Sequence, residues 1–308
     1  MVDYQTHTFK ALGSNITIQT DIPKNIAKKA FKEIENYFEH INTIASRFKP
    51  ESELNLLNNH IGYTVEVHPE LVEIIQDAYY AYQITDGNFD PRILTSLNNL
   101  GYTQTFKNNK WENINTTPHT ITERWTPNLT TSKINIGSHP IDLGGIGKSY
   151  TAVKASKILE GYTNNYFLNA GGDIIFSGVA PDGQPWTVGV ENPYIKTEHP
   201  LAILKIQDQT VATSSTAKNN WKDTTGKTYH HLINPKTGLP VATNIIAITI
   251  IHDDLITAEI WSKSLFLETE QGMTEITDNL NLPALWFTKD NKMHYNKHMK
   301  PYITWLPN

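Results

Sequence analysis

The sequence predicts an α+β fold in which mixed or antiparallel sheets are flanked by helices. Apolar runs of strand length follow one another through the second half of the chain without a helix after every strand. A doubly wound sheet would alternate strands and helices regularly, so this order favours α+β. Two long amphipathic helical patterns in the first third of the chain supply the flanking layer, and no internal repeat is visible.

The first elements follow from periodicity. Residues 15–20 alternate as a strand, and residues 25–44 have the apolar spacing of a helix. A second helix is predicted over residues 69–84. Its apolar positions, which we expect to face a core, are Leu71, Ile74, Ile75, Ala78 and Tyr82.

Residues 107–131 are rich in Asn and Thr and contain Pro118 and Pro127, which predicts a polar surface excursion with room for one strand pair. Residues 133–177 read as strand, turn, helix, strand, turn and strand. The remaining predicted elements are strands over 186–191, 201–207, 210–214 and 245–251 and a helix over 255–267.

Length and composition restrict the class of protein. With 308 residues and 39% hydrophobic content, the chain can form one unit, as a single domain or as two lobes that share a ligand cleft. A net charge of −5 without a basic stripe argues against nucleic acid as a partner. The absence of cysteine excludes disulfides, thiolate catalysis and zinc–thiolate sites.

The N-terminal residues show no basic segment followed by an apolar one, and no run approaches 18 apolar residues. We therefore expect no membrane insertion and no lipid anchor, and a cytoplasmic location.

Two glycine-containing turns, at residues 142–149 and 169–173, each follow a short apolar run that reads as a buried strand. The first opens into a helical pattern over 150–159, whose N-terminus favours an anion, and Lys148 adds a cation there. A Walker A loop would need glycine where Asp142 stands, and a Rossmann fingerprint would need a third glycine. The turns predict either nucleotide binding of another kind or two tight turns in a sheet.

Seven segments stand in order along the chain. They are ASRFKPESEL (45–54), DGNFDP (86–91), DLGGIGK (142–148), NAGGD (169–173), VATSS (211–215), HHLINPKTG (230–238) and TAEIWSKSL (257–265). Together and in this order, they resemble the ApbE family of FAD:protein FMN transferases. The resemblance covers residues 8–290 and implies an ApbE-like, T-fold-like architecture. It also implies an enzyme that cleaves FAD, attaches FMN through a phosphoester bond to a Thr or Ser of an acceptor protein and releases AMP, usually with Mg²⁺.

The resemblance implies roles for individual residues. Phe48 would stack on the adenine, Leu12 would line the flavin pocket, and Lys148 would face the diphosphate. Asp173 has two interpretations, as a ligand-binding group or as a turn cap. The same two interpretations apply to Asp90, which precedes Pro91. The full set of implied FAD-contacting residues is Leu12, Phe48, Asn88, Phe89, Asp90, Asp142, Lys148, Asn169, Gly171, Gly172, Asp173, Thr213 and Ile233.

His231 is the predicted catalytic residue. Transfer to a hydroxyl requires removal of the acceptor proton, and histidine is the side chain that titrates in the useful range. The resemblance places a functional histidine at this position, although a histidine in a strand is more often structural.

The implied metal site departs from the family pattern. The family usually offers Mg²⁺ an Asp and, four residues later, a Thr, where this chain has Glu259 and Lys263. Mg²⁺ would be held by Glu259, Ser262 and the Gly145 carbonyl, or the Lys263 ammonium would replace part of its charge. The third possibility is an ordinary solvated Glu–Lys pair on a helix.

Asn234 is a second departure, since the family commonly has Asp there. It would weaken the site if that Asp orients His231, and would change little if it only caps a turn. The sequence leaves two function classes in contention, an FMN transferase and a protein that binds or hydrolyses FAD without transfer. An acceptor protein is a weaker third, because the chain lacks the acceptor pattern.

Overall fold

The computed structural model describes residues 4–103, 114, 117–218, 220–222 and 226–307. Its largest element is an eight-stranded sheet in the order β1-β2-β6-β7-β10-β15-β16-β17, in which every neighbouring pair is antiparallel. The strands are β1 (Gln5–Ala11), β2 (Ser14–Thr20), β6 (Tyr166–Ala170), β7 (Asp173–Ser177), β10 (Thr210–Ser215), β15 (Ile245–His252), β16 (Ala284–Thr288) and β17 (Met293–Tyr295). This arrangement confirms the predicted α+β class.

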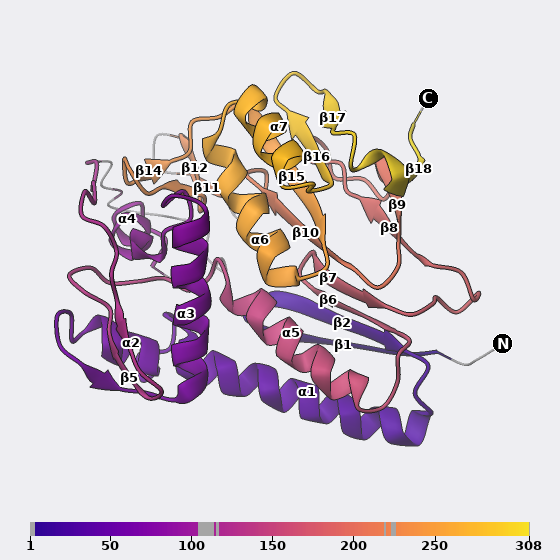
Figure 1. Cartoon of the computed structure of the whole chain (residues 1–308), viewed down its shortest axis with the longest axis horizontal. Coiled ribbons are helices and arrows are strands. Elements are labelled where there is room, and N and C mark those ends of the chain that lie inside the picture. Colours follow the sequence, from indigo (N-terminus) through magenta and orange to yellow (C-terminus); the bar gives the residue numbers. More distant parts are fainter. Residues whose placement is uncertain (1–3, 104–113, 115–116, 219, 223–225, 308) are drawn as a thin grey trace.

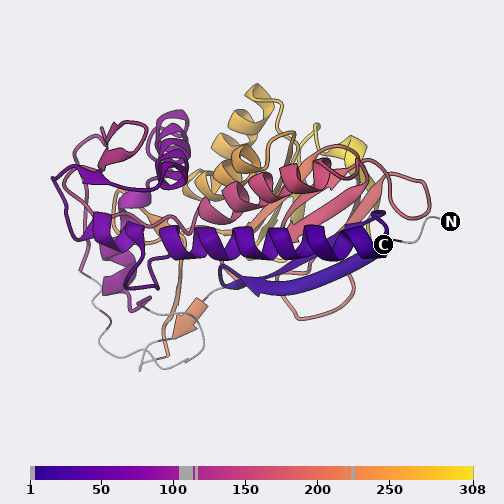
Figure 2. The ribbon, with the colours of Figure 1, turned by 90° about the horizontal axis from the view of Figure 1, so that it is seen from below.

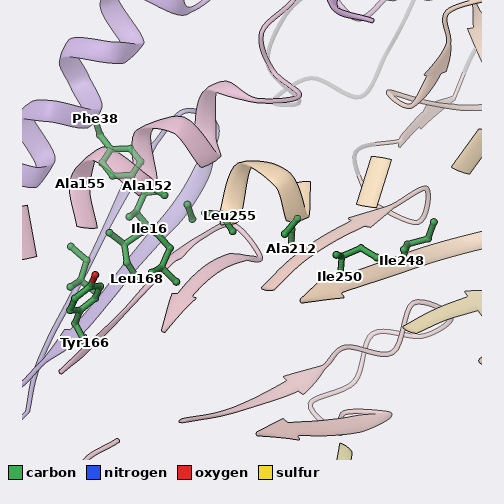
Figure 3. Packing of buried hydrophobic residues seen from close by; sticks show 14 of the residues in the cluster. Ile16, Phe38, Ala152, Ala155, Tyr166, Leu168, Ala212, Ile248, Ile250 and Leu255 are labelled. Carbon is green, nitrogen blue, oxygen red and sulfur yellow. The ribbon is translucent and has the colours of Figure 1, made fainter. Parts of the chain in front are cut away.

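Four helices cover one face of this sheet (Figure 1). They are α1 (Lys24–Ala45), α5 (Gly147–Glu160), α6 (Leu255–Ser264) and α7 (Glu270–Asn279). Figure 2 shows α1 running lengthwise along the molecule. In Figure 3, Phe38 and Ala152 pack over Ile16 and Leu168 of the sheet, in a core whose members are almost fully buried.

A three-stranded sheet covers the opposite face, in the order β18-β9-β8. Its strands are β8 (Trp186–Val190), β9 (Ala202–Ile206) and β18 (Ile303–Trp305). Successive side chains of a strand point to opposite faces, so the central strands are apolar on both. On β15, Ile248 and Ile250 join the helix-side core, while Ala247 and Ile251 join the core under the small sheet.

A second lobe lies beside the sheet, at the left of Figure 1. It contains α2 (Glu53–Asn58), α3 (Pro69–Ile84), the short helices η1 (Pro91–Ile93) and α4 (Leu94–Asn99), and a small sheet of β3 (Val65–Glu66), β5 (Lys133–Asn135) and β4 (Asn128–Leu129). It has its own apolar core. The C-terminal turns of α1 reach this core through Ile41 and Ile44, so α1 belongs to both lobes.

The predicted surface excursion over residues 107–131 lies partly outside the described residues. Its described part enters the core of the second lobe through Trp125, which is buried and donates its indole N–H to the Ile136 carbonyl at 2.9 Å. The strand pair in this region is β4 with β5.

Two short ladders and two single turns complete the described elements. They are β11 (Asn220–Lys222) with β12 (Thr228–His230), β13 (Ile233–Asn234) with β14 (Leu239–Pro240), and the 3-10 helices η2 (Leu265–Leu267) and η3 (Lys300–Tyr302).

The sequence pattern located the main helices and strands within a few residues. α5 begins at Gly147, three residues before its predicted start, and the helix predicted over 255–267 ends as α helix at Ser264 and continues as η2. The pattern missed β1, α7 and β16. Among the described residues, no helix combines the length and apolar character that a bilayer crossing requires.

Candidate active site

A cluster of four charged side chains, two buried carboxylates and two partly exposed ammonium groups, lies where α5 begins. The Lys148 ammonium donates a short hydrogen bond to Asp173 at the start of β7 and lies 3.5 Å from Glu259 Oε1 on α6. Lys263, one turn further along α6, donates to the same Glu259 oxygen at 2.6 Å. Three elements far apart in sequence therefore place two ammonium groups and two carboxylates together.

Burial and charge pairing set the ionisation of this cluster. Burial works against the charge of Lys148, but Asp173 and Glu259 outweigh it and raise the Lys148 pKa. Burial also opposes ionisation of Glu259, yet Lys263 and Lys148 lower its pKa. For Asp173 burial prevails over Lys148 and raises the pKa. With all four groups ionised, two positive charges balance two negative ones.

Glu259 is fully buried, and its second carboxylate oxygen, Oε2, has no hydrogen-bond partner among the described residues. Full burial rules out the solvated surface pair that Glu259 and Lys263 could have formed. A buried acceptor without a donor is costly, which points to a ligand group at this oxygen.

The first glycine turn is held by Asp142. Its Oδ1 accepts from the Gly144 N–H at 3.0 Å, and its Oδ2 forms an ion pair with Arg47 Nε at 2.7 Å. The helix that follows has Ile146 as its N-cap, without a side-chain cap, and has no acidic residue in its first turn. That end of α5 can accept an anion beside Lys148.

Arg47 also organises an aromatic group. Its guanidinium lies 4.2 Å from the ring centroid of Phe48 and 4.4 Å from that of Tyr102, and it donates to the Tyr102 carbonyl at 2.7 Å. Phe48 is about one-third exposed, so it retains a face for a planar ligand. Arg47 Nη2 is buried without a partner among the described residues.

Phe89 packs directly on the glycine turn, since a Cβ added at Gly145 would lie 3.2 Å from its ring. Its neighbour Asn88 donates to Glu268 Oε1 at 2.6 Å, which links this loop to the end of η2. The Asp90 carboxylate caps η1 and forms a two-oxygen ion pair with buried Arg92. This favours the turn interpretation for the Asp90 side chain.

The second glycine turn is capped by Asn169, whose Oδ1 accepts from the Gly172 N–H at 2.8 Å. Asp173 therefore serves the charged cluster, whereas Asn169 caps the turn. Gly171 and Gly172 both have positive φ, and a Cβ on Gly171 would meet Ser14 Oγ at 2.6 Å.

The contact with Ser14 brings in the hairpin between β1 and β2. Leu12 and Gly13 have φ values of 47° and 75°, as a two-residue type I′ turn requires. Leu12 is bulky for a left-handed conformation, and its side chain packs at the edge of the helix-side core.

The side chains of Ser262, on α6, and Thr213, on β10, lie on different sides of the large sheet. The Ser262 hydroxyl is buried and bonds Ser214 of β10 at 2.8 Å and the Glu259 carbonyl at 2.9 Å. Thr213, the neighbour of Ser214 on the strand, is exposed on the other face and bonds Thr249 at 2.9 Å. β7 pairs with β10 only up to Val211, so Thr213 lies beyond that pairing.

His231 is half-buried between β12 and β13. Ile233 belongs to a small core with Trp221 and Tyr229. Asn234 Oδ1 accepts from the Lys236 N–H at 2.9 Å, and the Asn234 carbonyl accepts from Gly238 at 2.8 Å. Asn234 thus caps a turn, a role that asparagine fills as well as aspartate.

Two open cavities border this region. One, of about 350 Å³, lies between the loop around Gly87, the Ile121–Arg124 segment and Lys236. The other, of about 380 Å³, lies between β14 and the end of η2, and its lining residues include Asn234, Val241 and Glu268.

The implied Mg²⁺ finds an incomplete donor set in these side chains. Glu259 Oε2 offers one oxygen, but Asp173 is paired with Lys148, and Ser262 is bonded to Ser214. Lys263 cannot coordinate a metal and occupies the other Glu259 oxygen. Mg²⁺ needs several oxygen ligands, so these residues do not form a protein-held magnesium site.

Sequence reasoning missed Arg47 and Glu268 as site residues. Arg47 stood inside a family-like segment and was visible as a charge beside Phe48. Glu268 carries no local signal, because its partner Asn88 is 180 residues away.

The comparisons with known proteins decide the family. Residues 12–286 match the ApbE family. The chain belongs to the ApbE family. FAD:protein FMN transferase of Haemophilus influenzae is 24% identical over 83% of this chain and 77% of its own length. The protein of that name from Vibrio cholerae is 24% identical over 88% of this chain and 84% of its own.

Solved structures of ApbE-family proteins share the fold. The apbe protein of Thermotoga maritima superposes with a TM-score of 0.82 at 23% identity, over 97% of this chain and 99% of that one. Flavin transferase ApbE from Vibrio cholerae gives a TM-score of 0.78 at 21% identity over the same shares. These likenesses confirm the predicted ApbE-like architecture.

Proposed function

We propose that this ApbE-family chain is an FAD:protein FMN transferase, the name its curated relatives carry. It would split FAD, attach FMN through a phosphoester bond to a Thr or Ser of an acceptor protein, and release AMP. The observation that carries the proposal is that four segments, 45–54, 86–91, 169–173 and 257–265, all contact the glycine turn 142–148, whose Lys148 forms the charged cluster at a helix start without a side-chain cap.

The cluster suits a diphosphate. Each ammonium has three N–H donors. Lys148 directs donors at Asp173 and Glu259, and Lys263 directs one at Glu259. The remaining N–H groups are available for phosphate oxygens. The start of α5 adds backbone dipoles of the same sign. When the diphosphate binds, the two ammonium groups counter its charge and the charge that develops in the transition state.

The aromatic group gives the nucleotide a second contact. Phe48 would stack on the adenine. Arg47 would hold the Phe48 ring in place through its guanidinium and Asp142 through its ion pair. Phe89 and Leu12 would form apolar walls on either side of the glycine turns. Asn88, Asn169, Thr213 and Ile233 complete the proposed contacts.

In the transfer step, the acceptor hydroxyl oxygen attacks the phosphorus on the flavin side of the diphosphate. The bond from that phosphorus to the bridging oxygen breaks, and AMP leaves with the electron pair. The hydroxyl proton passes to the His231 imidazole.

We assign part of the positive charge that Mg²⁺ would supply to the Lys263 ammonium, which lies 2.6 Å from Glu259. Both a fixed ammonium and a divalent ion can stabilise charge on the diphosphate.

The test is incubation of the purified protein with FAD and an acceptor domain, read by in-gel flavin fluorescence. We expect a fluorescent acceptor and free AMP. Release of FMN and AMP without a labelled acceptor would instead identify an FAD pyrophosphatase.

The proposed base has its own test. His231→Ala should abolish transfer while FAD affinity stays within about an order of magnitude, because a base acts on the transition state. His230→Ala, one residue away, is the matched control and should retain transfer. Near-normal labelling by His231→Ala would show that the histidine is not the base.

A further inference from the structure

We propose that His40, His68 and Glu70 bind a divalent transition-metal ion such as Zn²⁺, at a site separate from the charged cluster. His40 lies on α1, His68 is the N-cap of α3, and Glu70 is in the first turn of α3. One ligand atom from each residue lies within 4.8 Å of the others. In the part of the chain that the structure describes, these are the three metal-ligating groups that come together.

The distances fit a shared ion. His40 Nε2 lies 2.6 Å from Glu70 Oε2, and His68 Nδ1 lies 3.6 Å from the same oxygen. The two imidazole rings are edge to face with centroids 4.9 Å apart. Ligands about 2.0–2.1 Å from Zn²⁺ in a tetrahedron lie roughly 3.3 Å apart, so small rotamer changes would complete the geometry.

The donor set selects the class of ion. Two neutral imidazoles and one carboxylate are ligands that Zn²⁺ accepts, while Mg²⁺ and Ca²⁺ prefer oxygen ligands. The side chains of His40 and His68 are 39% and 41% exposed, and that of Glu70 is 21% exposed. Water can therefore fill the fourth position.

Tyr37 supports the carboxylate from behind. Its hydroxyl donates to Glu70 Oε1 at 2.6 Å and leaves Oε2 for the histidines. A hydrogen bond to the outer oxygen of a ligating carboxylate is the usual support of a metal ligand.

One contact must change when the ion binds. His68 Nδ1 accepts the Glu70 N–H at 3.2 Å as the cap of α3, and the positive end of this helix opposes a cation. Binding through Nδ1 gives up this cap. We therefore expect weaker affinity than at a four-ligand structural zinc site.

The ion would tie α1, which belongs to both lobes, to α3 of the second lobe. Phe38 of α1 packs in the core of the large sheet, whereas Leu71 and Val72 of α3 lie in the core of the second lobe. In Figure 1, one end of α3 meets α1 near the bottom of the molecule. A bound ion should therefore raise the thermal stability of the whole chain.

The experiment uses the full chain after chelator treatment and dialysis. Zn²⁺ is titrated by calorimetry, Co²⁺ by its visible absorbance, and melting temperature is followed in the same samples. We expect one ion per chain, a Co²⁺ spectrum of low coordination number, a raised melting temperature, and no displacement by excess Mg²⁺.

The variants separate this site from other histidines. His40→Gln and His68→Gln keep hydrogen-bonding capacity and should each weaken Zn²⁺ binding at least tenfold. His7→Gln is the matched control, because His7 of β1 also pairs with a glutamate, Glu35 of α1, at 2.8 Å. It should bind Zn²⁺ like the unsubstituted chain. Absence of stoichiometric binding, or undiminished binding in His40→Gln, would overturn the proposal.

Discussion

Glu259 and Lys263 form an ion pair at the centre of the proposed site. Their i,i+4 spacing on α6 indicates that they can meet, and the structure adds that they meet beside Lys148 and Asp173, with the Glu259 carboxylate fully buried. An exposed pair of this kind contributes little, about 0.2–0.5 kcal/mol. A buried pair beside a bound diphosphate can act on catalysis.

Lys263→Thr should lower transfer about 10²-fold without added Mg²⁺ and recover part of the loss when Mg²⁺ is supplied, because it removes one fixed charge and restores an oxygen ligand. Initial rates with EDTA and with Mg²⁺ measure this. Lys157→Thr, from the exposed Lys157–Glu160 pair on α5, is the control. An unchanged rate and metal response in Lys263→Thr would remove Lys263 from the mechanism.

Asp77 on α3 offers a test by pH. Burial raises its pKa to about 6, and Asp254 and Glu73 add to the shift. A carboxyl whose folded pKa exceeds its ordinary value contributes stability at low pH and loses it as pH rises from about 4 through about 6.

Asp77→Asn cannot ionise, so it should stabilise the protein at pH 7.5 by about 1–2 kcal/mol, after allowance for the partial exposure of Asp77. The gain should shrink at pH 4.5. Denaturation curves at both pH values check this, with Glu33→Gln on the exposed face of α1 as control. Equal gains at both pH values would contradict the assignment.

At the level of elements, the β1–β2 hairpin and the turn between β6 and β7 hold each other in place. Ser14 fills the space beside Gly171, and the Gly171 N–H donates to the Asn15 carbonyl at 3.2 Å. Both turns contain residues with positive φ. The hairpin therefore positions the glycine turn that presents Asp173 to Lys148.

Gly171→Ala should destabilise the protein by about 2–3 kcal/mol, from its positive φ and from the clash with Ser14. Gly172→Ala should cost about 1 kcal/mol, because its φ is also positive but its Cβ would meet no atom within 4 Å. Chemical denaturation measures the difference. Equal losses would mean that the contact with Ser14 does not constrain the turn.

At the scale of the whole molecule, the proposed FAD site draws on both lobes. Arg47 and Phe89 come from the second lobe, and Glu259 and Asp173 come from the large sheet and its helices. A ligand that bridges the lobes stabilises the native state by its binding free energy.

FAD at about 100 times its Kd should add about 2.7 kcal/mol and raise Tm by about 4 °C for a chain of this size. Riboflavin, which lacks the diphosphate, should give a smaller shift at equal concentration. Thermal denaturation with each ligand checks this. Equal shifts would place the binding energy on the flavin ring instead of the charged cluster.

The sequence by itself determined the α+β class, the main strands and helices, the two glycine turns and the segments that resemble the ApbE family. These depend on local periodicity, on turn residues and on motif order, which are all properties of the sequence alone. Asn234 as a turn cap could also be read this way, since its bonds lie within four residues.

Only the tertiary structure determined which of those segments contact one another. The Arg47–Asp142 pair, the Asn88–Glu268 bond and the His40–His68–Glu70 group join residues that no local pattern connects. The same holds for burial. The spacing of Glu259 and Lys263 was visible in the sequence. The exclusion of Glu259 from water depends on the packing of β7, α5 and α6 against one another. That packing determines whether the charges of the pair act on a ligand or are screened by solvent.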